Sequence, residues 1–123
     1  MDNVLQGKSA LIVGGTSGIG YRLAQVLLQE SASVVVQGKI NSKRVTNLCS
    51  QGNAAGFICD LQKMSYLNEL CRYANAADIL CVVYGPFLQK PLDITTAQEW
   101  TEIVYANLTL PGILVSSALA GMK

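Results

Sequence analysis

The sequence contains no histidine, the side chain that enzymes use most often as a general base and as a metal ligand. Charge is also scarce: 14% of residues are charged, with nine basic and eight acidic side chains spread along the chain. A nucleic-acid-binding protein needs a basic patch or stripe, and the sequence has none. We therefore expect neither a metal site nor a nucleic-acid partner.

The four cysteines, at 49, 59, 71 and 81, form no Cys-x-x-Cys pair. This pattern favours reduced, buried thiols over a disulfide framework. The first residues have neither the basic nor the long apolar segment of a signal peptide. Together these features predict a cytoplasmic protein.

Residues 103–122 contain no charged side chain and are long enough to span a bilayer. The stretch nevertheless contains polar and helix-breaking residues: Asn107, Thr109, Pro111, Gly112, Ser116 and Ser117. Such residues are unfavourable on a lipid-facing helix. We expect a helix buried within protein and no membrane partner.

Short apolar strands alternate with helical patterns along the chain. Strands are expected at residues 8–13, 33–36, 55–59 and 79–83, and apolar residues recur at helical spacing within 19–27, 45–49 and 64–74. Thr96 and Glu99 form a capping box that opens a long final helix. This order predicts an α/β fold of one domain, 1–123, a three-layer doubly wound (Rossmann) parallel sheet of about four strands. The fourth strand would form an apolar sheet edge that something must cover.

A glycine cluster, LIVGGTSGIG at residues 11–20, lies where the first strand ends and the first helix begins. Gly14 suits a tight turn, Gly18 permits close approach of a phosphate, and Gly20 permits close packing of helix on strand. Backbone N–H groups at a helix N-terminus bind phosphate, so the loop predicts a pyrophosphate site. The alternative is a structural turn that happens to be rich in glycine.

Residues 13–20, VGGTSGIG, resemble the TGxxxGIG fingerprint of the classical short-chain dehydrogenase/reductase family. The resemblance extends along the whole chain but corresponds to the N-terminal half of a typical member. It implies an NAD(P)-dependent oxidoreductase that transfers hydride between nicotinamide and a carbonyl or alcohol. The residues it implies at the pyrophosphate are Gly14, Thr16, Ser17, Gly18, Ile19 and Gly20. Val13 replaces the usual threonine, whose hydroxyl helps to hold the loop in the family, so the loop must be held differently here.

The second strand is followed by Gln37, Gly38 and Lys39, where an NAD-binding fold would carry a carboxylate for the ribose 2′-hydroxyl. Lys39 could instead bind a 2′-phosphate, with Lys43 and Arg44 nearby. This pattern favours NADP over NAD. The alternative is that all three cations are solvated surface charges.

Two further positions match the family around the cofactor. The resemblance implies that Asp60, after the third strand, binds the adenine amino group; an aspartate that stabilises the turn is the alternative, and both can hold. The family's Asn-Asn-Ala-Gly is represented by VVYG at residues 82–85, in which only Gly85 is retained. Tyr84 could lie at the cofactor rim or in the core.

Asn107 matches the asparagine of the family's Asn-Ser-Tyr-Lys tetrad, whose backbone carbonyl binds a relay water. Pro111 has no N–H and cannot bond the carbonyl of Asn107 four residues earlier, which supports this role. The alternative is a buried asparagine beside an unrelated kink.

The rest of the tetrad is missing, because no tyrosine is followed by lysine four residues later. A tyrosine of lowered pKa is the family's acid and base, so the chain by itself should be catalytically incomplete. Two other interpretations stay open: a non-catalytic dinucleotide-binding or redox-sensing module, and a truncated inactive product. The long helix forms subunit interfaces in the family, which implies a homodimer or higher oligomer. The substrate cannot be read from these residues.

Overall fold

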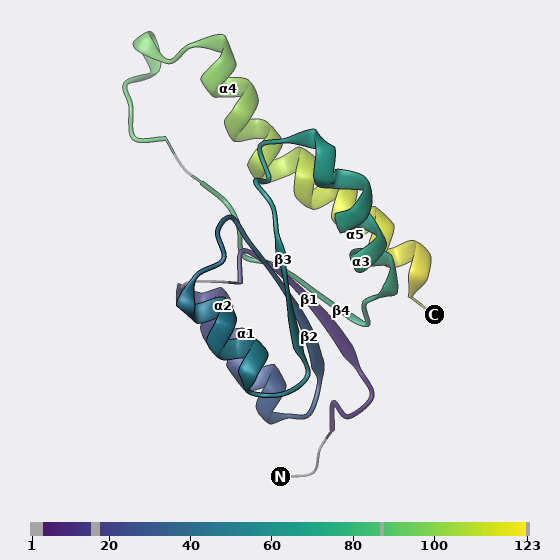
Figure 1. The fold of residues 1–123 in the computed structure, drawn as a ribbon. Coiled ribbons are helices and arrows are strands. Elements are labelled where there is room, and N and C mark those ends of the chain that lie inside the picture. The colour runs from purple at the N-terminus through teal and green to yellow at the C-terminus, as the bar shows by residue number, and fades with distance from the viewer. Residues whose placement is uncertain (1–3, 16–17, 87, 123) are drawn as a thin grey trace.

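A computed structural model of the chain describes residues 4–15, 18–86 and 88–122. Its four strands are all parallel and lie in the order β3-β2-β1-β4. The strand bounds are β1 Ser9–Val13, β2 Ser33–Gly38, β3 Ala54–Ile58 and β4 Ile79–Val82. The predicted parallel sheet is confirmed (Figure 1).

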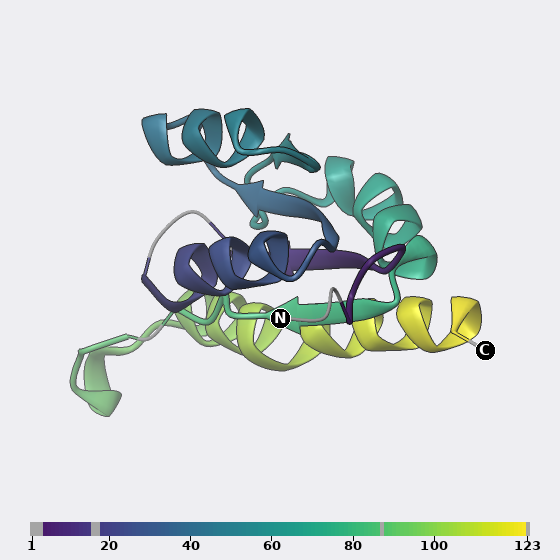
Figure 2. The same cartoon turned by 90° about the horizontal axis from the view of Figure 1, so that it is seen from below.

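Helices cover both faces of the sheet (Figures 1 and 2). Helices α1 and α2 lie on one face, and α3 and α5 lie on the other. Their bounds are α1 Gly18–Gln29, α2 Lys43–Ser50, α3 Leu67–Ala76, α4 Ala97–Val104 and α5 Leu110–Gly121. The resulting three layers are those of a doubly wound fold.

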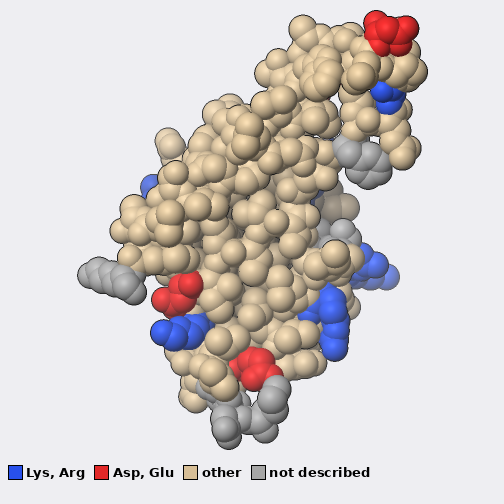
Figure 3. Space-filling model, turned by 180° about the vertical axis from the view of Figure 1, so that it is seen from behind, with Lys and Arg blue, Asp and Glu red and all other residues tan. Residues whose placement is uncertain are grey.

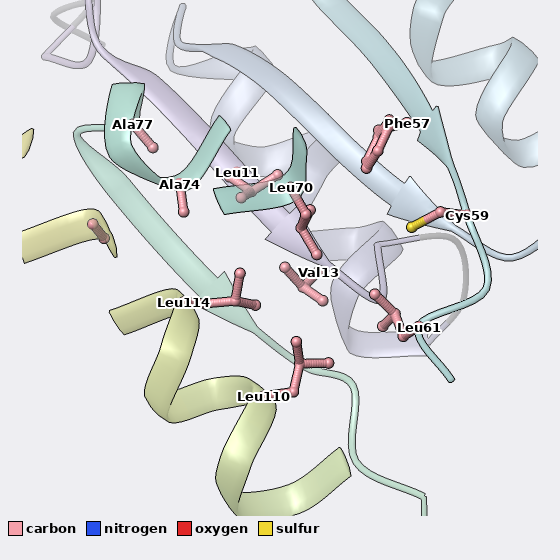
Figure 4. Close-up of a cluster of buried hydrophobic side chains, with 11 residues drawn as sticks. Leu11, Val13, Phe57, Cys59, Leu61, Leu70, Ala74, Ala77, Leu110 and Leu114 are labelled. Atoms are coloured by element: carbon pink, nitrogen blue, oxygen red, sulfur yellow. The ribbon is translucent and has the colours of Figure 1, made fainter. Parts of the chain in front are cut away.

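The central strand β1 divides the core into two clusters because successive side chains point to opposite faces. Leu11 and Val13 pack with Leu70 of α3 and with Leu110 and Leu114 of α5 (Figure 4). On the opposite face, Ile12 packs in a second cluster that contains residues from α1 and α2. A strand buried on both faces is apolar throughout, which explains why residues 10–13 show no polar alternation.

The helix starts follow from local chemistry. The Ser42 side chain accepts a hydrogen bond from the Val45 N–H and caps α2. The predicted capping box opens α4, since Thr96 and Glu99 bond each other's backbone N–H groups. The third helix differs slightly from its prediction, because residues 64–66 form a 3₁₀ turn, η1 Met64–Tyr66, before α3.

The last helix is continuous from residue 97 to 121 but contains one π-helical turn, η3 Tyr105–Thr109. The Leu110 N–H donates to the Tyr105 carbonyl, five residues earlier. Pro111 follows at once, so the predicted irregularity of this helix takes the form of a π turn. By length and composition alone the helix could cross a membrane, and 22% of its most apolar window is buried inside the protein.

Candidate functional site

The turn between β1 and α1 is shaped by two glycines, at which a larger residue would strain the backbone or displace the helix. Gly14 adopts φ +86°, a left-handed conformation that favours glycine. A Cβ on Gly20 would overlap the Gly14 carbonyl oxygen and lie 2.7 Å from Cγ2 of Val83. Gly20 therefore lets α1 pack directly against the turn and the sheet, as the sequence predicted.

Gly18 differs from these two because its surroundings are open. Its φ is +55°, it begins α1, and no atom lies within 4 Å of where its Cβ would be. Ile19 is also exposed. The N-terminus of α1 thus presents accessible backbone at the place where a helix binds anions. Thr16 and Ser17, the predicted hydroxyl donors, lie outside the described residues.

The buried side chain of Gln37, at the end of β2, holds the start of the turn. Its Oε1 accepts from the Gly14 N–H at 3.0 Å, and its Nε2 donates to the Cys59 carbonyl at 2.9 Å. The Gln37 carbonyl also accepts from the Gly15 N–H at 3.0 Å. Residue 13 is valine and has no hydroxyl to hold the glycine turn. The side chain and the backbone carbonyl of Gln37 hold the turn instead.

A cavity of about 440 Å³ opens at the carboxyl ends of the strands. It is lined by Gly14, Gln37, Gly38, Lys39, Cys59, Asp60, Leu61, Gln62, Val83, Tyr84, Gly85 and Pro86. Ligands of open α/β sheets bind at this end, outside the strand ends. Four predicted cofactor residues, Gly14, Lys39, Asp60 and Gly85, are brought together here.

Asp60 and Tyr84 line this cavity and are linked through Gln62. The Asp60 carboxylate accepts from the Gln62 N–H at 3.0 Å, so it stabilises its own turn while lining the cavity. Gln62 Nε2 donates to the Tyr84 hydroxyl at 3.0 Å. Tyr84 therefore lies at the cavity rim, and it also packs against the core behind it. Sequence reasoning missed this contact, which joins residues 22 positions apart.

The cationic residues after β2 lie on two elements. Lys39 lines the cavity, whereas Lys43 and Arg44 are exposed in the first turn of α2. The Arg44 guanidinium lies over the Tyr21 ring of α1, 5.6 Å from its centroid. A cation at that distance is attracted by the ring face.

Asn107 occupies the middle of the π turn and reaches the loop after β4. Its Nδ2 donates to the Pro86 carbonyl at 2.7 Å and to the Ile103 carbonyl at 3.1 Å. A Cβ on Gly85 would lie 2.8 Å from Asn107 Oδ1, so the retained glycine permits this approach. Asn107 is thus exposed rather than buried, and it contacts the loop that carries Gly85 and Pro86, two residues that line the strand-end cavity.

A second, more apolar cavity of about 320 Å³ lies between the loop after β4 and α4. Trp100, Ile103 and Asn107 line it together with a Lys90–Glu99 ion pair of 2.7 Å. The hydrogen bond from Lys90, followed by those from Thr96, lowers the pKa of Glu99 to about 2.

The cysteines are free thiols. Burial raises the pKa of Cys59 and Cys81, which keeps both thiols protonated and weakly reactive. Among the described residues no group of three His, Cys, Asp or Glu side chains is placed to hold a metal ion. Of the four thiols only Cys59 is buried, and Cys49 is exposed, so the prediction of buried thiols holds for Cys59 alone.

Comparison with known proteins places this geometry in a family. The family model for short chain dehydrogenases matches residues 8–123. The chain belongs to the short-chain dehydrogenase family. It is 31% identical over 128 residues to D-beta-hydroxybutyrate dehydrogenase of Cupriavidus necator, covering 98% of this chain and 50% of that protein. It is 28% identical to human dehydrogenase/reductase SDR family member 2, mitochondrial, covering 98% of this chain and 46% of that protein.

The structure resembles solved short-chain dehydrogenase folds. A 3-oxoacyl (acyl-carrier-protein) reductase from Agrobacterium tumefaciens, solved with NADP bound, gives a TM-score of 0.84 at 24% identity, covering 98% of this chain and 49% of that one. The chain spans about half the length of the relatives that it matches. The family consists of oxidoreductases that bind NAD(P). In this chain the glycine turn lies at the carboxyl end of β1, a strand inside the four-stranded sheet.

Proposed function

We propose that residues 1–123 form one NADP-binding domain of a short-chain oxidoreductase that transfers hydride between nicotinamide and a carbonyl or alcohol. The observation that carries the proposal is the cavity at the strand ends, which places the glycine turn, Lys39 and Asp60 around one space. The residues fit a dinucleotide: Gly18 leaves open space above an accessible helix N-terminus, and a side chain on Gly20 would push α1 away from the turn.

The chain's own residues have separate binding roles in this proposal. The backbone at Gly18 and Ile19 binds the pyrophosphate, Lys39 binds the 2′-phosphate, and Asp60 accepts from the adenine amino group. Asn107 holds a relay water through its carbonyl. When bound, the cofactor supplies the hydride. Without a tyrosine and lysine four residues apart, these residues alone bind the cofactor but do not turn over substrate.

Preference for NADP is supported by the absence of a carboxylate at the end of β2. Gln37 there is buried and engaged with the backbone, and Lys39 is the exposed charge beside the cavity. A lysine ammonium forms a charge-assisted hydrogen bond with a phosphate, and this bond is stronger than the one that it can donate to the neutral 2′-hydroxyl of NAD. NAD should therefore bind more weakly.

Calorimetric titration with NADP⁺ and NAD⁺ tests the proposal. We expect tighter binding of NADP⁺, and we expect Lys39→Ala to weaken NADP⁺ by about tenfold while changing NAD⁺ by less than about threefold. Lys63→Ala, which removes an exposed lysine that does not line the strand-end cavity, is the matched control. Failure of the wild-type chain to bind either dinucleotide would refute cofactor binding, and equal affinities would refute the preference.

We also propose that the protein is cytoplasmic and that it forms a homodimer or higher oligomer. In this proposal the long helix, residues 97–121, forms the subunit interface. Figure 3 shows that the face along this helix is almost free of charged side chains. Its exposed apolar residues form a stripe: Trp100, Val104, Leu108, Val115 and Leu119. Apolar surface of this kind is typical of an interface rather than of free surface.

Sedimentation velocity tests the oligomer. We expect Leu108→Glu to shift the chain to monomer, because an unpaired carboxylate would be buried at the interface. Val4→Glu, at an exposed apolar residue outside the helix, should leave the oligomer intact. A wild-type chain that sediments as a monomer at high concentration would contradict the proposal.

A further inference from the structure

We propose that Gln37 is a positioning residue for the cofactor site. Its side-chain amide fixes the glycine turn against the end of β3, and thereby sets the spacing between the pyrophosphate and adenine sides of the cavity. We call the two hydrogen bonds from the Gln37 side chain, to the Gly14 N–H and the Cys59 carbonyl, the clamp. The effect of the clamp on nucleotide affinity rests on the proposed function. The clamp itself is a property of the free chain.

The environment of Gln37 is unusual for a polar side chain. It is 2% exposed, and within residues 4–15, 18–86 and 88–122 it is the one buried polar or charged side chain. Its oxygen and its nitrogen bond groups from two different strand ends, β1 and β3. A buried polar group with both ends satisfied by the backbone specifies a geometry, because each partner would otherwise be left unpaired.

The two partners are the backbone groups that begin the two sides of the cavity. Gly14 starts the glycine turn at φ +86°, and the Cys59 carbonyl immediately precedes Asp60. Gly14 and Asp60 both line the cavity. One amide therefore links the turn that leads to the helix N-terminus with the residue before Asp60, which lines the same cavity.

Only a side chain with an acceptor and a donor can make both bonds. Methionine has similar length but offers neither a strong acceptor nor a donor. An ionised carboxylate can accept from the Gly14 N–H but repels the Cys59 carbonyl, whereas a protonated carboxyl can make both bonds. Gln37→Met and Gln37→Glu thus separate loss of the clamp from loss of packing.

The first experiment measures amide hydrogen exchange by NMR in the ligand-free chain. In Gln37→Met we expect the Gly14 N–H to exchange at least about tenfold faster, while the amides of Ile12 and Val36 keep their protection. Gln29→Met, at an exposed glutamine at the end of α1, should change none of them. Unchanged exchange at Gly14, or equal acceleration at all three amides, would overturn the proposal.

The second experiment uses pH to restore the clamp in Gln37→Glu. The titratable groups nearby are the Cys59 thiol, 3.7 Å from Nε2, with Asp60 and Glu69 acting on that thiol, and Lys39 and Tyr84 on the cavity wall. Burial raises the pKa of an introduced carboxyl. We expect the Gly14 N–H chemical shift of this variant to titrate above the usual range of glutamate and to approach the wild-type value as the pH falls.

Affinity for NADP⁺ should follow the same titration. Relative to wild type at each pH, Gln37→Glu should bind about tenfold more weakly when the carboxyl is ionised and nearly equally when it is protonated. Gln29→Glu should keep a ratio near one throughout. Unchanged NADP⁺ affinity in both Gln37 variants, despite faster Gly14 exchange, would overturn the positioning role.

Failure of the proposed function is distinguishable from failure of this inference. If the wild-type chain binds no NADP⁺, the cofactor assignment is refuted, and Gly14 exchange and its pH dependence still decide whether Gln37 holds the turn. If the wild-type chain binds NADP⁺ and Gln37→Met exchanges and binds as wild type does, the inference alone is refuted.

Discussion

Gly20→Ala should destabilise the fold because α1 approaches the sheet too closely for a methyl group. The added Cβ would overlap the Gly14 carbonyl oxygen and lie 2.7 Å from Val83 Cγ2 and 3.0 Å from Gly15 Cα. Two of these three neighbours are backbone, which cannot rotate away, so relief requires moving the helix. Overpacking of this kind costs about 3 kcal/mol.

The net effect is smaller because alanine favours a helix more than glycine does. Gly20 lies in α1, where this preference is worth about 1 kcal/mol. The expected loss of unfolding free energy is therefore about 2 kcal/mol. For a domain of 123 residues this corresponds to a fall in Tm of about 8 °C.

Gly112→Ala is the matched control, because Gly112 lies in α5 with no atom within 4 Å of its Cβ position. Only the helix preference acts there, so we expect a gain of about 1 kcal/mol and a Tm about 4 °C higher. Calorimetry at equal protein concentrations measures both, since oligomerisation makes Tm depend on concentration. A Gly20→Ala variant as stable as wild type would refute the close-approach argument.

Three further predictions concern the last helix and the loop before it. Thr96→Ala removes the capping hydroxyl and should lower the free energy of unfolding by about 1 kcal/mol in a urea titration, whereas Thr96→Ser should lose little. The hydrogen bond from Lys90 is the largest cause that lowers the pKa of Glu99 to about 2. The ionised Glu99 carboxylate therefore stabilises the fold fully above about pH 4.5, and this stabilisation is lost as the pH falls toward 2. The difference in urea midpoint between wild type and Glu99→Gln should therefore narrow across that window, and a constant difference would contradict the ion pair. Asn107→Leu should leave the Pro86 carbonyl without its donor and increase proteolysis of the loop after β4, while Asn107→Gln should partly restore protection.

The sheet and the glycine turn could be predicted from sequence because their signals are local. Apolar runs bounded by turn residues mark strands, and the spacing of Gly14, Gly18 and Gly20 predicts a turn that meets a helix N-terminus. Caps behave in the same way, since Thr96 and Glu99 are three residues apart. Each of these predictions depends on contacts within a few residues of the chain.

The missed contacts are those between residues far apart in sequence. Gln37 bonds Gly14 across 23 positions and Cys59 across 22, and Tyr84 meets Gln62 across 22. No periodicity reports such pairs, because they depend on which strand ends become neighbours. The one available signal was the amide of Gln37, a polar side chain that directly follows the apolar run Val34, Val35 and Val36 of β2.

The strand order explains why these particular residues meet around one cavity. In the order β3-β2-β1-β4, the chain moves outward from β1 through β2 and β3 and then returns to the other side of β1. The connections therefore diverge between β1 and β4, and an open α/β sheet forms its ligand crevice at this switch point. Gly14 follows β1 and Tyr84 follows β4, and a Cβ on Gly14 would lie 3.0 Å from the Tyr84 nitrogen. Both sides of the crevice thus come from the described residues, whereas no tyrosine and lysine pair spaced for proton transfer occurs in the sequence. The proposed cofactor site and the proposed lack of turnover thus depend on different residues, and each can be tested without the other.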